Sequence, residues 1–293
     1  MADLICKICP KVSLYIARLD ERRATGSGQR QITAKSAAEV SVNFPPFHSR
    51  HSMTLTKAIQ WATKCGVNII SMSWTIETPV EGNDDMTLFR NAVDQAAAKK
   101  ILMFCSTSDQ GSSTKDNCYP GGFGNCIRIG GATSTGEALS WVNAEKVDFL
   151  LPGKDLPFAN NEGKIISHES GSSIATAAAS GLAGLLIFCS WLVGARDGQF
   201  QDQKSMERAF KALAGGSTNK FPHVQDYFKD RFKRELAKLQ ERDEQERDDE
   251  KDERKVMMSI TQRMAKIDIE SLVWQDDCTN ALGKLLEYVT DRN

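Results

Sequence analysis

Two adjacent serines at the start of a long apolar segment are the residues of this sequence best placed to do chemistry. Ser172 and Ser173 follow Gly171 and lead into a run of alanine, glycine and leucine that reaches Leu186. The first turn of a helix carries N–H groups without helical partners and a partial positive charge. A serine there is most often an N-cap, but it can also be a nucleophile whose neighbouring N–H groups stabilise an oxyanion.

The helix predicted after these serines has unusually small side chains. Ala is the best helix former and Gly the worst of the ordinary residues, so Gly181 and Gly184 cost stability. Such glycines are favoured where another part of the chain approaches closely. We therefore expect a deeply buried helix that packs tightly against a sheet.

The composition is that of an ordinary globular chain. It has 293 residues, 41% of them hydrophobic, and a formal net charge of −1, enough for one large domain with an appendage. This balance gives no argument for a nucleic-acid or membrane partner. Neither a signal peptide nor a membrane-spanning segment is evident, and eight cysteines without a secretory signal indicate mostly free thiols in a reducing compartment. We expect a cytoplasmic protein.

The cysteines and a glycine-rich loop give no cofactor or metal site. Cys6 and Cys9 have CxxC spacing, but no second pair completes a zinc site, so we interpret them as residues of one helix face. Cys118 and Cys126 flank the loop and could pair, although a reducing compartment argues against it. The loop, 121–124, lacks the lysine and the spacing of a phosphate-binding loop. We therefore expect neither a cofactor nor a metal.

Strand-like and helix-like segments alternate along the first two thirds of the chain. The strand candidates are 11–19, 67–74, 101–106, 126–133 and 147–153, and the helix candidates are 54–66, 84–100 and the segment from Ser172 to Leu192. A polar insertion spans 20–52. This alternation predicts an α/β fold with a parallel sheet covered on both faces, and active sites of such sheets lie beyond the carboxyl ends of the strands. Two polar segments, 71–74 and 106–111, stand at such ends.

The last third of the chain differs in character. Residues 195–223 are Gly-rich and polar, which predicts a linker with a short helix inside. From 224 to 293 the chain is predicted to be helical and highly charged: every residue from Glu241 to Lys255 except Gln245 carries a charge. A solvated helix with i,i+4 ion pairs is the favoured interpretation. A coiled-coil site for a protein partner is the alternative, although the run has no apolar a/d seam.

Three segments together resemble the subtilisin-like serine protease (subtilase) family. The stretch after Glu169 is similar to the family's Gly-Thr-Ser-Met-Ala-Thr-Pro motif: Gly171, Ser173, Ala175 and Thr176 match, whereas Ser172, Ile174 and Ala177 replace Thr, Met and Pro. The segment 67–74 resembles the strand that flanks the substrate, and 101–111 resembles the strand and loop with the oxyanion asparagine. Order and spacing agree over residues 1–194, which we expect to be one peptidase domain.

The resemblance implies a fold, a reaction and roles for particular residues. The fold would be the family's three-layer α/β arrangement, incomplete at the N-terminus and followed by the charged helical tail. The reaction would be hydrolysis of a polypeptide substrate with Ser173 as nucleophile. Substrate would lie along Ser71, Met72, Ser73 and Trp74. Asp109 stands where the family has its oxyanion Asn, and an ionised Asp cannot donate the hydrogen bond that an Asn gives. Alternatively, Asp109 caps its own turn.

The family's other catalytic motifs are missing from the sequence. Neither Asp-Thr/Ser-Gly nor His-Gly-Thr occurs, and we expect surface or structural roles for His48, His51, His168 and His223. The stretch 1–19 resembles the segment that follows the family's His-Gly-Thr motif, with Ala2 at the start of its helix. We therefore hypothesise that the chain begins inside the peptidase domain, after the catalytic His.

Two alternatives to an active protease follow from these departures. The first is a catalytically inactive relative that serves as a binding scaffold, with the charged tail as its contact. The second is another α/β serine hydrolase, because residues 171–175 also approximate Gly-x-Ser-x-Gly, and Asp197 and His223 follow in the required order. For this chain alone, inactivity is the favoured prediction, since no base is identified to activate Ser173.

Overall fold

A four-stranded parallel sheet forms the centre of the computed structural model, which describes residues 1–17, 22–23, 30–31, 55–76, 84–111, 118–160, 163–192, 200–216 and 218–224. Its strands, in spatial order, are β3 (Ile69–Met72), β4 (Leu102–Ser106), β5 (Ile127–Ala132) and β6 (Phe149–Pro152). All neighbouring pairs are parallel. The short pair β1 (Arg22–Arg23) and β2 (Arg30–Gln31) is antiparallel. An antiparallel hairpin of β7 (Leu156–Ala159) and β8 (Ile165–Glu169) leads into the serine segment.

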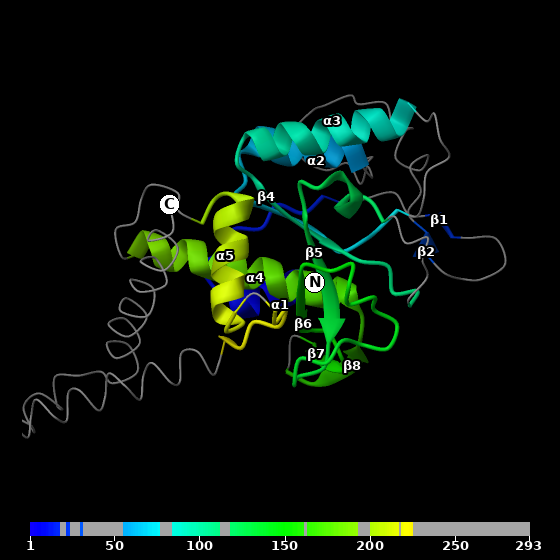
Figure 1. The fold of residues 1–293 in the computed structure, drawn as a ribbon, viewed down its shortest axis with the longest axis vertical. Helices are drawn as coiled ribbons and strands as arrows, with labels where there is room; N and C mark the ends of the chain where they lie inside the picture. The colour runs from blue at the N-terminus through cyan, green and yellow to red at the C-terminus, as the bar shows by residue number, and fades with distance from the viewer. Residues whose placement is uncertain are drawn as a thin grey trace, which may run out of the picture.

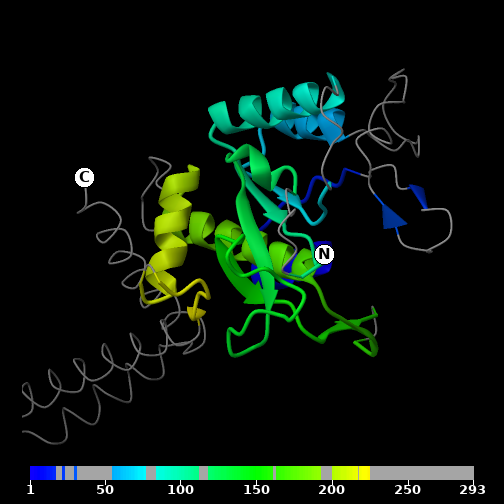
Figure 2. The ribbon, with the colours of Figure 1, turned by 45° about the vertical axis from the view of Figure 1, so that its right-hand side comes forward.

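Helices cover both faces of the sheet. On one face lie α2 (Leu55–Cys65) and α3 (Asp84–Ala98), and on the other lie α1 (Ala2–Ile8), α4 (Ser172–Leu192) and α5 (Gln203–Leu213) (Figure 1). The turned view in Figure 2 keeps the two helix layers on opposite sides of the strands. A short 3-10 turn, η1 (Gly121–Phe123), precedes β5. The predicted α/β architecture with a parallel sheet between helices is confirmed.

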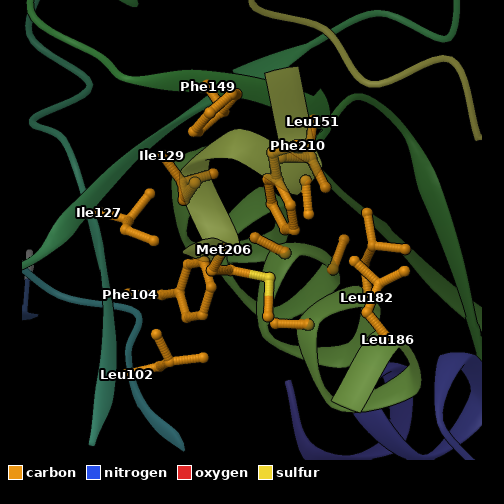
Figure 3. Close-up of a cluster of buried hydrophobic side chains, with 14 of the residues drawn as sticks. Leu102, Phe104, Ile127, Ile129, Phe149, Leu151, Leu182, Leu186, Met206 and Phe210 are labelled. Atoms are coloured by element: carbon orange, nitrogen blue, oxygen red, sulfur yellow. The ribbon is translucent and has the colours of Figure 1, made fainter. Parts of the chain in front are cut away.

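The largest core cluster lies between the sheet and α4 and α5. Phe210 packs against two rings of the sheet there: its ring centroid lies 6.0 Å from that of Phe104 and 5.2 Å from that of Phe149. Figure 3 shows Met206 and Phe210 of α5 among side chains from the strands and from α4. The segment that we expected to be a linker, 195–223, therefore contributes large side chains to the core. The apolar face of α5 was not evident in the sequence, because polar and glycine residues surround its few apolar positions.

The long helix α4 is a core helix. By length and composition it could cross a membrane, but 72% of its most apolar window is buried inside the protein. Two glycines of α4 lie beside the N-terminal segment: Gly181 is next to Ile8, and Gly184 is next to Cys9. A Cβ added to Gly181 would lie 2.9 Å from Cβ of Ile8, so the close approach that the glycine permits is that of α1. The expected packing of the buried helix against the sheet is confirmed, since α4 shares the largest core cluster with β4, β5 and β6.

The N-terminal apolar run is not the buried strand that we predicted. Residues 12–17 form no strand, and Tyr15 and Ile16 are 58% and 74% exposed. Within the described ranges no strand lies beside this run, and β3 is an edge of the four-stranded sheet. An apolar run becomes a buried strand only where neighbouring strands accept its hydrogen bonds and cover its side chains.

Candidate active site

The ends of two strands and the start of α4 meet at Ser172. Its hydroxyl donates to Asp109 Oδ1 at 2.6 Å and accepts from the Gly131 N–H at 3.0 Å. The Thr107 hydroxyl lies 3.5 Å away. Thr107 and Asp109 follow β4, and Gly131 lies in β5. Ser172 is fully buried, so its hydroxyl is committed to joining the sheet to the helix and is closed to any ligand.

Ser173 is in a different situation one residue later. Its side chain is half-buried, and its hydroxyl makes no hydrogen bond to any residue that the structure describes. Its Oγ lies within 3.5 Å of the position that a Cβ on Gly171 would occupy. Of the two serines, Ser173 is therefore the one whose hydroxyl is neither fully buried nor bound to a described residue.

Glycine is required at position 171 by the backbone that presents these serines. Gly171 has φ +146°, a conformation that side-chain-bearing residues rarely adopt. Its N–H donates to the Gly153 carbonyl at 2.8 Å, which joins the turn after β6 to the start of α4. A Cβ at this position would also lie 3.2 Å from Asp109 Oδ2. Any other residue at position 171 would be both strained and crowded, which explains the glycine of the motif.

One backbone N–H in the first turn of α4 is available to a ligand. The Ser172 N–H donates to Asp109 Oδ2 at 2.9 Å, and the N–H groups of Ile174 and Ala175 donate to the Gly171 carbonyl. The Ser173 N–H has no hydrogen-bond partner among the described residues. A free N–H at a helix N-terminus, next to an accessible hydroxyl, can stabilise negative charge that develops beside that hydroxyl.

Asp109 acts as a cap for α4, not for its own turn. Both of its oxygens accept from Ser172, which lies 63 residues away in the sequence. The turn that carries it is held by a hydrogen bond from the Gly111 N–H to the Trp141 carbonyl at 2.7 Å. A carboxylate here satisfies an orphan donor and complements the helix dipole. The same contact turns its oxygens toward Ser172, and a carboxylate has no N–H to offer an oxyanion.

The segment expected to bind substrate lies at the carboxyl end of β3. Ser71 accepts a hydrogen bond from the Ser180 hydroxyl at 2.8 Å, and Met72 is only 2% exposed. Met72 therefore belongs to the core, and Ser71 joins β3 to α4. Ser73 and Trp74 are half-buried, and the Trp74 ring lies 6.1 Å from the ring of Phe89 on α3.

The described histidines do not pair with either serine. His168 is exposed on β8, opposite Pro157. The His223 ring lies 5.1 Å from the ring of Phe221 and hydrogen-bonds Asn219. His48 and His51, as well as Asp197, lie outside the described residues.

Sequence reasoning missed two groups that hold Ser172. Thr107 and the Gly131 N–H both reach its hydroxyl. The available signal was the position of each segment at or near the end of a predicted strand. Nothing in the order of the residues indicated that the strand ends converge on Ser172 instead of on Ser173.

Comparison with known proteins matches these elements to one family. The model of the subtilase family matches residues 7–188. The intracellular serine protease of Paenibacillus polymyxa is 29% identical over 136 residues, 45% of this chain and 40% of that protein. Subtilisin DY of Bacillus licheniformis is 27% identical over 137 residues, 45% of this chain and 47% of its own. The chain thus spans less than half of the length of either relative.

A solved structure supports the fold assignment. The crystal structure of a lanthipeptide protease is similar with a TM-score of 0.53 and 16% identity, over 73% of this chain and 66% of that one. Likeness at this identity shows the fold alone. Because the family match covers more than half of the chain, we reject the alternative of a different α/β serine hydrolase.

Proposed function

Because the chain belongs to the subtilase family, we propose that it carries the nucleophile of a subtilisin-like serine endopeptidase and that this nucleophile is Ser173. The observation that carries the proposal is the difference between the two serines. Ser172 is buried and hydrogen-bonded to Asp109 and to the Gly131 N–H, whereas neither the hydroxyl nor the N–H of the half-buried Ser173 has a hydrogen-bond partner among the described residues. A polypeptide substrate is the ligand that this arrangement suits.

The reaction would begin with attack of Ser173 Oγ on a peptide carbonyl. The Ser173 N–H would donate to the oxygen on which negative charge develops. Substrate backbone would run along the carboxyl end of β3, past Ser73 and Trp74. A serine hydroxyl needs a base, and the base needs an orienting acid, so an active enzyme requires a His and an Asp that the described residues do not bring to Ser173.

Asp109 limits the rate of such an enzyme. With Asp in place of the family's Asn, the site lacks the side-chain donor to the oxyanion. Loss of one such donor costs about 3 kcal/mol in the transition state, or about 10²–10³ in rate. We therefore propose a slow peptidase.

The contact between Asp109 and Ser172 favours a second candidate function, a protease-like binding scaffold. The Asp109–Ser172 contact stabilises the start of α4 and contributes nothing to hydrolysis. In this case residues 224–293, with their mixed charges, would provide the contact with a protein partner.

We also propose a cytoplasmic location and no cofactor. The name of the Paenibacillus polymyxa relative, an intracellular serine protease, supports the location. The division into a peptidase domain over 1–194 and a charged helical region over 224–293 stays a prediction.

The experiment that tests the function is hydrolysis of an unfolded polypeptide by the protein isolated from its native cells. The transcript upstream of the Met1 codon is read first, so that the variants carry every residue of the natural chain. Ser173→Ala should abolish hydrolysis, whereas Ser172→Thr, which restores the family's residue, should retain it. If the parent protein and both variants all failed to hydrolyse the polypeptide, the result would favour the scaffold.

A further inference from the structure

One edge of the central sheet carries apolar residues that the described part of the chain leaves partly exposed. This edge is β3, whose residues Ile69, Ile70 and Ser71 are only half-buried, whereas every residue of its neighbour β4 is buried. Ile69 packs against the core cluster of α4, and Ile70 packs against the cluster under α2 and α3. Because helices cover both faces of β3, its remaining exposure lies along its edge.

The backbone of β3 also presents polar groups along this edge. The Asn68 carbonyl, just before the strand, accepts from the Leu102 N–H of β4 at 3.0 Å. In a parallel ladder the N–H and C=O groups of successive residues point to opposite sides, so those of Ile69 and Ser71 point away from β4. No described residue pairs with them. A row of unpaired N–H and C=O groups is a template for pairing with another strand.

The sequence of β3 lacks the features that usually protect a sheet edge from such pairing. Protected edges carry charged side chains, proline or a bulge. Residues 67–74 contain no charged residue and no proline, and the register of β3 with β4 is regular over the whole strand. Nothing along β3 therefore repels a second strand that is apolar and uncharged.

An exposed apolar segment crosses beside the same edge. Cys9 and Ile69 lie against the same point of α4, on one face of the sheet. Further along the chain, the Tyr15 ring lies 6.1 Å from the Trp61 ring of α2, which covers the opposite face. Residues 10–17 make no backbone hydrogen bond to β3, and Tyr15 and Ile16 are largely exposed. The open edge is thus accompanied by apolar side chains that the described residues do not cover.

The opposite edge of the sheet, by contrast, is occupied. That edge is β6, and its Leu150 N–H donates to the Lys220 carbonyl at 2.8 Å. A second copy of the chain that added its β3 to β6 would produce an open-ended row of molecules, but it meets a strand that is already paired. Pairing of β3 with β3 uses the same surface on both copies and closes as a dimer.

We propose that β3 and residues 14–16 form a homodimer interface, in which the β3 edges of two copies pair antiparallel about a two-fold axis. A second copy is the occupant because the added strand must be uncharged and apolar on both faces, and β3 is such a strand. With the axis at Ile70, Ile69 stands opposite Ser71 of the second copy, and their outward N–H and C=O groups satisfy one another. Like faces of the two sheets stay together, so Tyr15 and Ile16 of both copies would lie at the seam.

The test combines light scattering during size-exclusion chromatography with amide hydrogen exchange, both on the full chain. The parent should have twice the mass of one chain and should dissociate on dilution. The amides of Ile69 and Ser71 should exchange more slowly in the concentrated than in the diluted protein. Ile16→Lys places a charge at the seam without altering a buried residue, so it should give a monomer. Ile166→Lys, at an equally exposed position on β8, is the matched control and should remain dimeric.

Three results would overturn the proposal. The first is a chain that stays monomeric at every concentration. The second is a dimer in which the Ile69 and Ser71 amides exchange at the same rate before and after dilution, which would place the interface elsewhere. The third is an equal effect of Ile16→Lys and Ile166→Lys on the mass. The first two are read from the unsubstituted chain, so a variant that fails to fold does not affect the decision.

Discussion

Replacing Gly181 with alanine should destabilise the protein, whereas the same change at Gly184 should stabilise it. Both glycines lie inside α4, where alanine is favoured over glycine by about 1 kcal/mol. They differ in what a methyl group would meet. At Gly181 it would lie 2.9 Å from Cβ and 3.2 Å from Cγ2 of Ile8, and 3.4 Å from the Cα of Ile5. At Gly184 the nearest atom is Cys9 Sγ at 3.5 Å, an ordinary contact.

The magnitudes follow from these distances. Overpacking of this kind costs about 1–3 kcal/mol, because the methyl group meets the backbone-proximal atoms of α1 and not the end of a flexible side chain. After the gain in helix propensity, Gly181→Ala should lower the free energy of unfolding by about 0–2 kcal/mol. Gly184→Ala should raise it by about 1 kcal/mol. The two variants should therefore differ by about 1–3 kcal/mol.

Urea unfolding followed by circular dichroism measures this difference directly. A double-mutant cycle with Ile8→Gly, which removes the clashing Cβ, provides the control. In that background Gly181→Ala should become as stabilising as Gly184→Ala. Equal stabilisation by both single variants would refute the reasoning, since it would mean that α1 does not lie against Gly181.

Three further predictions concern the start of α4 and the start of α5. Asp109→Asn should increase labelling of Ser173 by a fluorophosphonate up to about 10²–10³-fold, because an amide can donate to the oxyanion; an unchanged rate would exclude this role for the position. Ser172→Ala should cost about 1–3 kcal/mol in urea unfolding, because it leaves buried polar partners unsatisfied. Asp202 caps α5 by accepting from the Ser205 N–H at 2.9 Å, so Asp202→Ala should cost about 1 kcal/mol at neutral pH. Burial opposes ionisation of Asp202, but the hydrogen bonds from Ser205 outweigh it and lower its pKa below 3.8. The cap's contribution is therefore complete above that pH and is lost as the pH falls through the folded-state value, so melting curves of the variant and the parent should converge in acid.

Local patterns in the sequence predicted the layers of the fold. The alternation of apolar strands and amphipathic helices was sufficient for β3 to β6 and for α2 to α4. It failed for residues 12–17, because composition reports that a segment is apolar but not whether a neighbouring strand will cover it. It also missed the contribution of α5 to the core, because the buried face of a short helix is diluted by polar residues around it.

The candidate site could be predicted only in part. The motif that begins at Gly171 indicated a helix start at the two serines, and α4 begins at Ser172. The sequence also placed Asp109 at the end of a strand. It did not indicate that both carboxylate oxygens would bind Ser172, because a contact across 63 residues depends on how β4, β5 and α4 pack together.

The central claim is that Ser173, and not the adjacent Ser172, is the nucleophile. The most direct test is to label the protein from its native cells with a fluorophosphonate and to locate the adduct by fragmentation of the peptide that contains both serines. The account predicts that all of the adduct is on Ser173 and that Ser173→Ala abolishes it. An adduct on Ser172, or labelling that survives Ser173→Ala, would contradict the account.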